Sequence, residues 1–443
     1  MTDISIDAGA EGIIKDLEAA GFSAYITGGA VAEYLLGLPL TLINIATSAT
    51  PGDIVSIYKN QANVNPRTKT VTVIKNQMGY EISTFRATEQ SFGFAPDIYD
   101  EMAQSVFTIE ALAFNRTEGF LDFFSGVDDI KKKKIRLLNS PEEVFLKNPG
   151  EMLRGVRLCV TLGFSFDDET EKAVRKFSAL SKQIPYSVRL EEFNKLLTSA
   201  TPSKGFLMLK ELGLLSGLIP ELVRCFSTPQ KNKYHIYNVG EHIMSVLDNS
   251  PKELMLRWAA LLHDIGKPIC SSVDSNGIIH FYGHHRESME IADKILNKLH
   301  IEHNMMRDIL VLIEYHDVRI DPSMPVVKRL LSKIGAPLFE KLLVLQEADA
   351  RAKNPEFIPE KLEKIRVLRH MNEIITQENQ PYRISDLAIN ARDLIKIKYK
   401  AGRQINDTLR ILLEDVIVNP SLNDHVYLIN KAKSLKSGKG SKR

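Results

Sequence analysis

The chain has 443 residues and a net charge of +2, with 44% apolar and 25% charged residues. This length predicts three or four compact units, and so small a net charge does not by itself favour nucleic-acid binding. No apolar run reaches the length of a membrane span, and the N-terminal MTDISIDAGAEG lacks a basic start followed by a hydrophobic stretch. We therefore expect no membrane segment and no secretory signal. Three widely spaced cysteines favour reduced thiols in a cytoplasmic protein.

Histidine is the residue type with the most uneven distribution. Nine of the eleven histidines lie between His235 and His316, so we expect any metal or proton chemistry there. Basic residues gather at 131–134 and in the C-terminal KAKSLKSGKGSKR. Both runs could contact phosphates, although a solvated charge run is the commoner explanation. We expect residues 433–443 to form a disordered basic tail.

The first 140 residues mix short predicted strands with helices. A Gly28-Gly29 turn separates the first strand from a helix that begins at about Val31. The predicted strands are 23–27, 70–74, 80–85 and 121–124. From about Pro141 onward, apolar residues recur at three- and four-residue spacing, which is typical of helices. The segments with this pattern are 152–162, 191–197, 207–218, 254–262, 289–299 and 309–315. The sequence therefore predicts an α+β protein with a small α/β head and a long all-α body.

The Gly28-Gly29 turn is the first candidate binding feature. Glycines between a strand and a helix can present bare backbone N–H groups to a phosphate, although a tight turn alone would explain the pair. The longer string ITGGAVAEYLLGLPLTLINIATSATPGDI resembles the first motif of the class II tRNA nucleotidyltransferase and poly(A) polymerase family. In that motif a GG turn leads into a helix and then a DxD strand. The matching positions are Gly28, Gly29, Val31, Leu36, Gly37, Ile45, Ala46, Thr47 and Pro51.

The two carboxylates of that DxD strand are absent here. The resemblance implies that they bind two magnesium ions, and the matching positions are Leu42 and Asn44. Leucine cannot ligate a metal, and asparagine offers one neutral carbonyl oxygen. Glu81 and Arg86 are retained, but one acid cannot replace the pair. Magnesium at the head is therefore doubtful, and we expect the polymerase activity to be absent.

Two further motifs keep scaffold positions and lose polar ones. QSVFTIEALAF resembles the family's RRDFTxNA element, and KNPGEMLRGVRL resembles its nucleotide-reading EDPxRxLRxxR helix. The retained residues are Phe107, Thr108, Ala111, Leu153, Arg154 and Arg157, and the altered ones are Gln104, Ser105, Val106, Glu110, Asn148 and Glu151. Glu151 stands where an arginine donates hydrogen bonds to the incoming base, and a glutamate can only accept them. The remaining candidates for nucleotide or RNA binding are Gly28, Gly29, Arg154 and Arg157.

A second constellation lies in the body, where WAALLHDIGKP places His263 and Asp264 at the end of an apolar helix. A lone HD pair is weak evidence, because His263 could merely cap its helix while Asp264 pairs with a lysine. Other predicted helices, however, each offer a nitrogen or oxygen ligand. The pattern resembles the HD superfamily of metal-dependent phosphohydrolases, whose signature is H…HD…D. The signature matches His242, His263, Asp264 and Asp349, and His284 and His316 fit the extra histidines of members that hold more metal.

The HD resemblance implies a divalent cation that lowers the pKa of a bound water and polarises a phosphoryl oxygen. Asp264 would bind the metal or orient the water, and Lys267 would contact the substrate phosphate. Mixed nitrogen and oxygen ligation admits Mn²⁺, Ni²⁺, Co²⁺, Fe²⁺ or Mg²⁺. In HD-bearing nucleotidyltransferases the implied activities are 2′,3′-cyclic phosphodiesterase and phosphatase, which act on RNA or nucleotide ends.

The C-terminal part supports the same family. The segment ISDLAINARDLIKIKYKAGRQINDTL resembles its tRNA-binding segment, with Ala391 and Asn406 in place of two glycines. In all, the resemblance covers about residues 10 to 432. The predicted domains are a nucleotidyltransferase-like head at 1–140, a helical neck for RNA and nucleotide at 141–228, an HD domain at 229–354, a helical tRNA-binding tail at 355–432 and the disordered tail at 433–443.

Three hypotheses follow. The first is an HD phosphohydrolase that acts on RNA ends or nucleotides, on a tRNA-nucleotidyltransferase scaffold whose polymerase site is inactive. The second is an active CCA-adding transferase that uses CTP and ATP with unusual metal ligands. The third is a non-catalytic RNA-binding protein. All three imply RNA, most simply tRNA, as a partner, and all leave the oligomeric state open.

Overall fold

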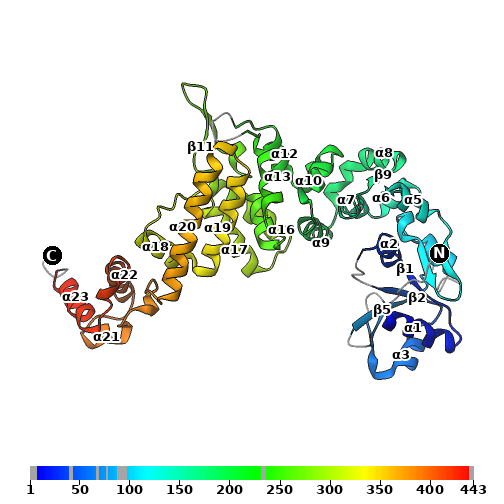
Figure 1. Ribbon diagram of the computed structural model, residues 1–443, viewed down its shortest axis with the longest axis horizontal. Helices are drawn as coiled ribbons and strands as arrows, with labels where there is room; N and C mark the ends of the chain where they lie inside the picture. The colour runs from blue at the N-terminus through cyan, green and yellow to red at the C-terminus, as the bar shows by residue number, and fades with distance from the viewer. Residues whose placement is uncertain are drawn as a thin grey trace. The chain divides into compact units, whose positions relative to one another are not determined.

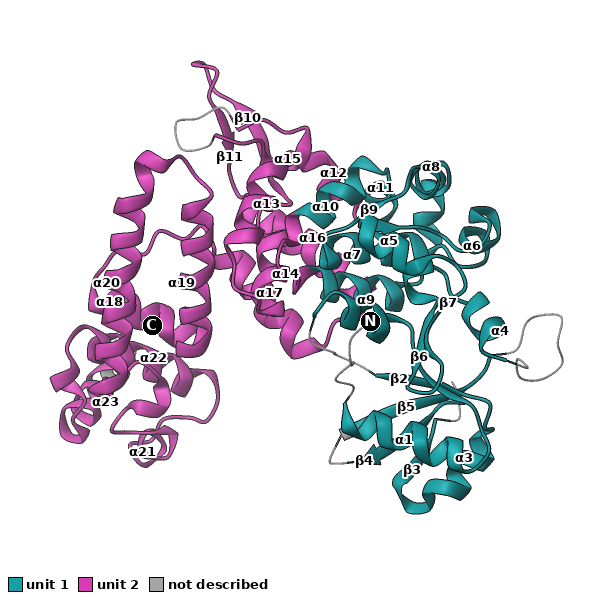
Figure 2. Cartoon of the chain, turned by 45° about the vertical axis from the view of Figure 1, so that its right-hand side comes forward, with its two compact units in different colours: residues 1–196, 204–218 teal, residues 197–203, 219–443 magenta. Residues whose placement is uncertain are grey.

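The computed structural model describes residues 7–38, 43–65, 69–75, 78–86, 97–230 and 236–438. The chain forms two compact units, residues 1–196 with 204–218 and residues 197–203 with 219–443 (Figure 2). Strands gather in the N-terminal part, and helices dominate the rest (Figure 1). The predicted α+β class is therefore confirmed.

The head is built on a seven-stranded sheet with the order β3-β4-β5-β2-β1-β6-β7. Its strands are β1 Ala24–Thr27, β2 Asn44–Thr47, β3 Ala62–Val64, β4 Val71–Lys75, β5 Met78–Thr84, β6 Leu112–Asn115 and β7 Gly119–Asp122. The pairing of β2 with β5 is parallel, and the other pairings are antiparallel. In this register Asn44 lies between Thr27 and Glu81 on neighbouring strands. The three polar residues therefore lie side by side across the middle of the sheet.

Helices surround the sheet and continue into the neck. They are α1 Ala8–Ala19, α2 Gly29–Leu35, α3 Pro51–Tyr58, α4 Ile98–Ala103, α5 Gly126–Lys132, α6 Pro141–Lys147, α7 Gly150–Leu162, α8 Asp168–Phe177, α9 Tyr186–Leu197, α10 Pro202–Glu211 and α11 Leu215–Leu218. A short parallel pair, β8 Lys134–Ile135 and β9 Ser165–Phe166, lies between them. The helical pattern predicted over 207–218 is interrupted, because Gly213 adopts a φ of 81° and ends α10. Glycine tolerates this left-handed conformation, which commonly terminates a helix.

The body consists almost entirely of helices. They are α12 Pro220–Phe226, α13 Val239–Asn249, α14 Leu254–Leu262, α15 Lys267–Cys270, α16 His284–Lys298, α17 His303–Tyr315, α18 Met324–Ile334, α19 Ala336–Arg351, α20 Ile358–Gln377, α21 Ala391–Lys396, α22 Arg403–Val418 and α23 His425–Gly438. One hairpin, β10 Ser271–Val273 with β11 Ile279–Phe281, interrupts them. Helix α14 is the centre of this part, since every residue from Leu256 to Leu262 is buried. A helix that is apolar on all sides can only be stable inside a core.

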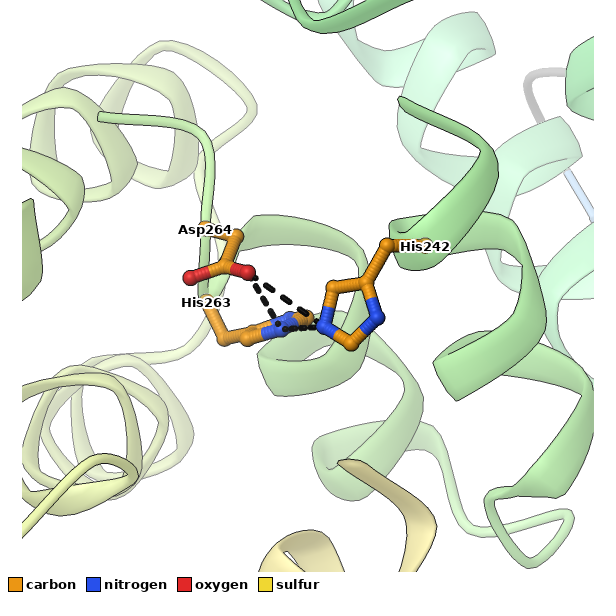
Figure 3. A group of neighbouring side chains, drawn as sticks. All are labelled: His242, His263 and Asp264. Carbon is orange, nitrogen blue, oxygen red and sulfur yellow. Dashed lines mark hydrogen bonds and ion pairs between the residues drawn. The ribbon is translucent and has the colours of Figure 1, made fainter. Parts of the chain in front are cut away.

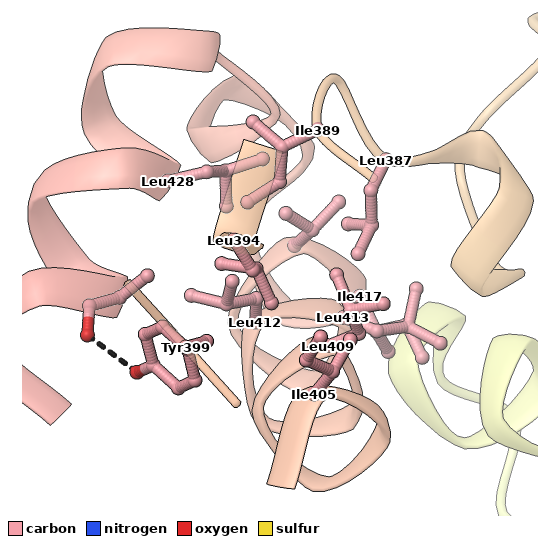
Figure 4. Close-up of a cluster of buried hydrophobic side chains, with 12 residues drawn as sticks. Leu387, Ile389, Leu394, Tyr399, Ile405, Leu409, Leu412, Leu413, Ile417 and Leu428 are labelled. Carbon is pink, nitrogen blue, oxygen red and sulfur yellow. Dashed lines mark hydrogen bonds between the residues drawn. The ribbon is translucent and has the colours of Figure 1, made fainter. Parts of the chain in front are cut away.

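The C-terminal helices have an apolar core of their own (Figure 4). Leu394, Leu412 and Leu428 are fully buried in it, and the hydroxyl of Tyr399 donates to the carbonyl of Ala432 at 2.6 Å. Helix α23 continues to Gly438, so the prediction of disorder was wrong for residues 433–438. The reason is that apolar residues of this helix, among them Leu435, pack on the same core. Residues 439–443 lie outside the described part of the chain.

None of the helices that the structure describes combines the length and the hydropathy needed to cross a membrane.

Candidate functional site

Three residues from two helices meet in the core of the HD region (Figure 3). His242 projects from α13, and His263 and Asp264 directly follow α14. The Nε2 atoms of the two histidines are 3.4 Å apart, and they lie 3.4 and 3.2 Å from Oδ2 of Asp264. All three side chains are buried. The predicted HD pair and its upstream histidine therefore converge on one point.

A second group uses the other oxygen of the same carboxylate. His284 begins α16, and His316 follows α17. Their Nε2 atoms lie 3.3 and 3.4 Å from Oδ1 of Asp264 and 3.3 Å from each other. Within the described residues, Oδ1 of Asp264 is buried and accepts no hydrogen bond. Asp264 is thus shared by two groups that could each hold a metal ion.

Asp349, the last residue of the predicted signature, joins the first group. Its Oδ1 lies 3.1 Å from Nε2 of His242, and its Oδ2 accepts from the ammonium of Lys353 at 2.5 Å. Oδ1 of Asp349 therefore faces His242, and Lys353 neutralises the charge at Oδ2.

The outer ring nitrogens of all four histidines face backbone carbonyls. Nδ1 lies 3.3, 2.8, 2.8 and 2.7 Å from a carbonyl oxygen for His242, His263, His284 and His316 in that order. A carbonyl can only accept, so Nδ1 carries a proton in each ring, and in a neutral imidazole Nε2 then presents its lone pair to the centre. Such outer hydrogen bonds orient histidines that bind metals. The helix-cap explanation of His263 accounts for its Nδ1 contact but not for its converging Nε2.

The charge states also suit a metal. Burial lowers the pKa of His242 to about 4, although Asp349 and Asp264 act in the opposite direction. Burial opposes ionisation of Asp264, but His263 and Lys267 hold the pKa of its carboxyl well below the usual range. Burial likewise opposes ionisation of Asp349, and Lys353 and His242 hold its pKa well below the usual range. Neutral imidazole with ionised carboxylate is the combination that metal binding requires.

Gly266 lets α16 approach the HD turn. A Cβ atom at this position would lie 2.4 Å from the backbone nitrogen of Ser288, so only glycine fits. The backbone N–H of Gly266 also donates to the Ser288 hydroxyl at 2.9 Å. This close contact brings the first turn of α16, and with it His284, to Asp264.

Three lysines surround the centre. Lys267, predicted to contact substrate, donates to Oδ2 of Asp264 at 2.6 Å and to Gln230 at 2.9 Å. Lys353 binds Asp349 as described, and Lys361 on α20 is close enough to interact with Lys353 directly. Lys353 was not predicted from the sequence, although its spacing of four residues from Asp349 is typical of an ion pair near a helix end.

A cavity of about 490 Å³ opens at the middle of the head sheet. Gly28 and Gly29 line it together with Asn44 and Glu81, as the family resemblance predicts. Leu42 lies outside the described residues. The other lining residues are Thr27, Thr70, Ser83, Arg86, Glu101, Met102, Gln104, Ser105, Val106, Glu110, Glu151 and Arg154.

The arginines of this cavity are bound to its own acids. Arg154 pairs with Glu151 at 2.7 Å and also with Glu110. Asn148 donates to Glu151 at 2.9 Å, so both altered residues of the nucleotide-reading helix belong to this network. Arg86 pairs with Glu101 at 2.7 Å.

Arg157, the other arginine predicted to bind nucleotide or RNA, does not line the cavity. Its side chain is largely buried and pairs with Glu192 at 2.5 Å. The partner role of Glu110 was also missed, because its 44-residue separation from Arg154 gives no pattern in the sequence.

The fold and these two sites define a nucleotidyltransferase-type head followed by an HD domain. Family comparison agrees: residues 24–136 match the "Poly A polymerase head domain", residues 163–225 the "Probable RNA and SrmB- binding site of polymerase A", and residues 233–354 the "HD domain".

The curated relatives that follow are named CCA-adding enzymes. The CCA-adding enzyme of Latilactobacillus sakei is 34% identical over 210 residues, which are 46% of this chain and 53% of the relative. That of a Geobacillus species is 32% identical over 211 residues, with shares of 46% and 52%. The chain thus matches about half the length of these curated relatives.

Solved structures share the fold along the whole chain. The Bacillus stearothermophilus CCA-adding enzyme in complex with CTP superimposes with a TM-score of 0.75 at 22% identity, covering 98% of both chains. The Thermotoga maritima CCA-adding enzyme complexed with tRNA gives 0.56 at 17% identity and the same coverage. The chain thus carries the head, RNA-binding and HD domains of these family models and is similar to class II tRNA nucleotidyltransferases.

Proposed function

We propose that this protein is a metal-dependent phosphohydrolase that acts on RNA ends or nucleotides, and that its head no longer adds nucleotides. One observation carries the proposal. Four imidazole Nε2 atoms, whose rings are fixed by backbone carbonyls, face the two oxygens of Asp264 at 3.2–3.4 Å. In neutral imidazoles these converging lone pairs repel one another, and a cation bound among them would relieve the repulsion.

The donor set fits divalent metal. His242 and His263 with Oδ2 of Asp264 would hold one ion, and His284 and His316 with Oδ1 would hold another. Asp349 would complete the first group through Oδ1. Imidazole and carboxylate together suit Mn²⁺, Fe²⁺, Co²⁺ or Ni²⁺, and Mg²⁺ fits less well because it prefers oxygen ligands alone. When bound, such a cation lowers the pKa of a water ligand and polarises a phosphoryl oxygen.

The chain's own residues then have distinct tasks. Asp264 joins the two groups, so it also fixes their spacing. Lys353 holds Oδ2 of Asp349, which would leave Oδ1 to bind a metal. Lys267 holds Oδ2 of Asp264 and is the nearest cation from which a substrate phosphate could accept a hydrogen bond. These groups would bind and orient a phosphoester, and phosphoester hydrolysis is the reaction class of HD phosphohydrolases.

The head supports the negative half of the proposal. Asn44 occupies the position of a metal-binding acid, and its neighbour Glu81 is one carboxylate where the chemistry needs several. Arg154 is held between Glu110 and Glu151, which neutralise its charge inside the cavity. Magnesium binding and recognition of the incoming base are thus both impaired.

CCA addition remains the second candidate, because the curated relatives are named CCA-adding enzymes and the head cavity is still open. The family and the likeness to a tRNA-bound structure favour tRNA as partner under either function. Incubating the protein with tRNA that lacks its CCA end, plus labelled CTP and ATP, tests this candidate directly. Incorporation at a rate typical of the family would replace our proposal for the head.

The main proposal is tested by metal analysis of the purified protein, followed by hydrolysis of a 2′,3′-cyclic nucleotide and of nucleotide monophosphates with added Mn²⁺, Ni²⁺ or Co²⁺. We expect bound metal and metal-dependent phosphate release. If the protein binds none of these metals at about micromolar concentration, the phosphohydrolase proposal fails, and a non-catalytic RNA-binding role takes its place.

A further inference from the structure

The hairpin β10–β11 ends in an unusually exposed aromatic side chain. Tyr282 directly follows β11 and is 76% exposed. Its ring stacks on His280, with ring centroids 5.2 Å apart and planes inclined by 6°. His280 and Tyr282 are two residues apart, so they project from the same face of the strand. One face of the tyrosine is therefore covered, while the rest is open to solvent.

Contacts of Asp274 within the hairpin hold the stack in place. Nε2 of His280 lies 2.8 Å from Oδ2 of Asp274. Oδ1 of Asp274 accepts from the backbone N–H groups of Asn276 and Ile278 at 2.8 and 3.0 Å, and so ties the hairpin turn. The aromatic plane is thus preorganised, which lowers the entropy lost when a planar ligand binds.

Phe281, which lies between the two stacked residues in the chain, contacts residues of the HD centre directly. The carbonyl of Phe281 accepts from Nδ1 of His284 at 2.8 Å, and the ammonium of Lys267 lies 5.4 Å from the centre of the Phe281 ring. Tyr282 is the next residue in the chain, and Gly283, with a φ of 75°, then turns the backbone into α16. Tyr282 therefore lies in the turn between the hairpin and α16, the helix that begins with His284.

We propose that the Tyr282–His280 stack is a platform for a nucleobase, so that the HD centre acts on phosphoesters that carry a base and discriminates against base-free ones. The inference rests on the proposed phosphohydrolase function and names its substrate class. Aromatic side chains bind bases through their faces, tolerate any base, and contribute about 1–3 kcal/mol per base. A preorganised ring with one stacked face, two residues before His284, meets this requirement.

The kinetic test compares adenosine 5′-monophosphate with ribose 5-phosphate, which share the phosphoester and differ in the base. We expect Tyr282→Ala to raise KM for the nucleotide about tenfold more than KM for the sugar phosphate, whereas Tyr282→Phe retains the preference. Val273→Ala is the control, since Val273 is 67% exposed on the same hairpin, and alternation along β10 and β11 places it on the opposite face. Metal content of each variant is measured alongside. Equal changes for both substrates, or no change, would overturn the platform.

A binding readout separates this inference from the proposed function. The fluorescence of 2-aminopurine riboside 5′-monophosphate is quenched when its base stacks on an aromatic ring. Quenching by the wild-type protein should weaken about tenfold in apparent affinity with Tyr282→Ala and persist with Tyr282→Phe and Val273→Ala. If neither phosphoester is hydrolysed but this pattern holds, the phosphohydrolase proposal fails and the platform stands. If hydrolysis occurs and quenching does not depend on Tyr282, the platform fails alone.

Discussion

The head cavity and the HD centre both gather charged side chains from distant segments, yet they use them in opposite ways. In the head, Arg154 and Arg86 are paired with glutamates of the cavity itself. In the HD centre, the imidazole Nε2 atoms face one another and Asp264, while their Nδ1 atoms are held by backbone carbonyls. The head arginines are thus neutralised by acids of their own cavity. In the HD centre Lys267 and Lys353 pair with the carboxylates, and the converging imidazoles additionally favour a bound cation. A pocket lined with charged groups is therefore weak evidence for binding until the partners of each group are known.

The largest expected effect concerns the head. Nucleotide incorporation by the wild-type protein should be absent, or lower by on the order of 10³-fold or more than in an intact relative, because metal clamping is lost. Leu42→Asp with Asn44→Asp should not restore it, since Arg154 stays paired. Adding Glu110→Asn and Glu151→Arg should release Arg154 and produce measurable addition of CTP and ATP to tRNA. Full recovery by the two aspartates alone would show that the ion network is irrelevant.

The next effect tests the HD centre through its shared carboxylate. Asp264→Ala should remove both metal groups and reduce phosphoester hydrolysis by more than about 100-fold, because loss of even an outer-shell partner commonly costs 10–100-fold. Metal content and hydrolysis should fall together. Circular dichroism should change little, and the matched control Asp293→Ala, on the surface-facing part of α16, should retain both metal and activity. Hydrolysis that survives without metal would contradict the assignment.

A smaller effect tests how the helices are brought together. Gly266→Ala places a Cβ against the backbone of Ser288, so α16 must shift and carry His284 away from Asp264. We expect a destabilisation of about 1–3 kcal/mol and a partial loss of bound metal. Thermal unfolding with and without added metal measures both. Gly277→Ala gives the contrast, because a Cβ there meets no atom within 4 Å and strains only the turn.

The smallest effect concerns Lys361. Burial, reinforced by Lys353, lowers its pKa from 10.5 to about 8. The fold therefore disfavours the charged form, and this cost is fully present below pH 8 and disappears as the pH rises towards 10.5. Lys361→Met should raise Tm by about 2 °C at pH 7, with a difference that shrinks at pH 10. Lys298→Met, at an exposed position of α16, should show no such dependence on pH.

The sequence predicted which side chains meet in the HD region, because the order of His242, His263, Asp264 and Asp349 follows a known signature. Their role as metal ligands stays a prediction. It also placed most helices, since apolar spacing persists through elements such as α14 and α16. The break at Gly213 was missed, because a single glycine decides it against a continuous apolar pattern. The helix beyond residue 432 was not predicted, because this segment is rich in charged residues. Its one leucine, Leu435, nevertheless packs on the core of the C-terminal helices.

Pairings across long separations could not be predicted. Glu110 meets Arg154 only because the loop after α4 and helix α7 border the same cavity, and Arg157 pairs with Glu192, which is 35 residues away. These contacts are products of tertiary structure, and no local periodicity encodes them.

Three of the four histidines share one local device: Nδ1 of residue i lies beside the carbonyl of residue i−3, as in His263 with Ala260, His284 with Phe281 and His316 with Ile313. The orientation of each ring is thus set by four consecutive residues and is kept wherever that segment lies. Substitutions elsewhere in the chain can move a whole segment but cannot easily turn its ring. Such a centre can be inherited intact while another site of the same chain, whose pairings span dozens of residues, decays.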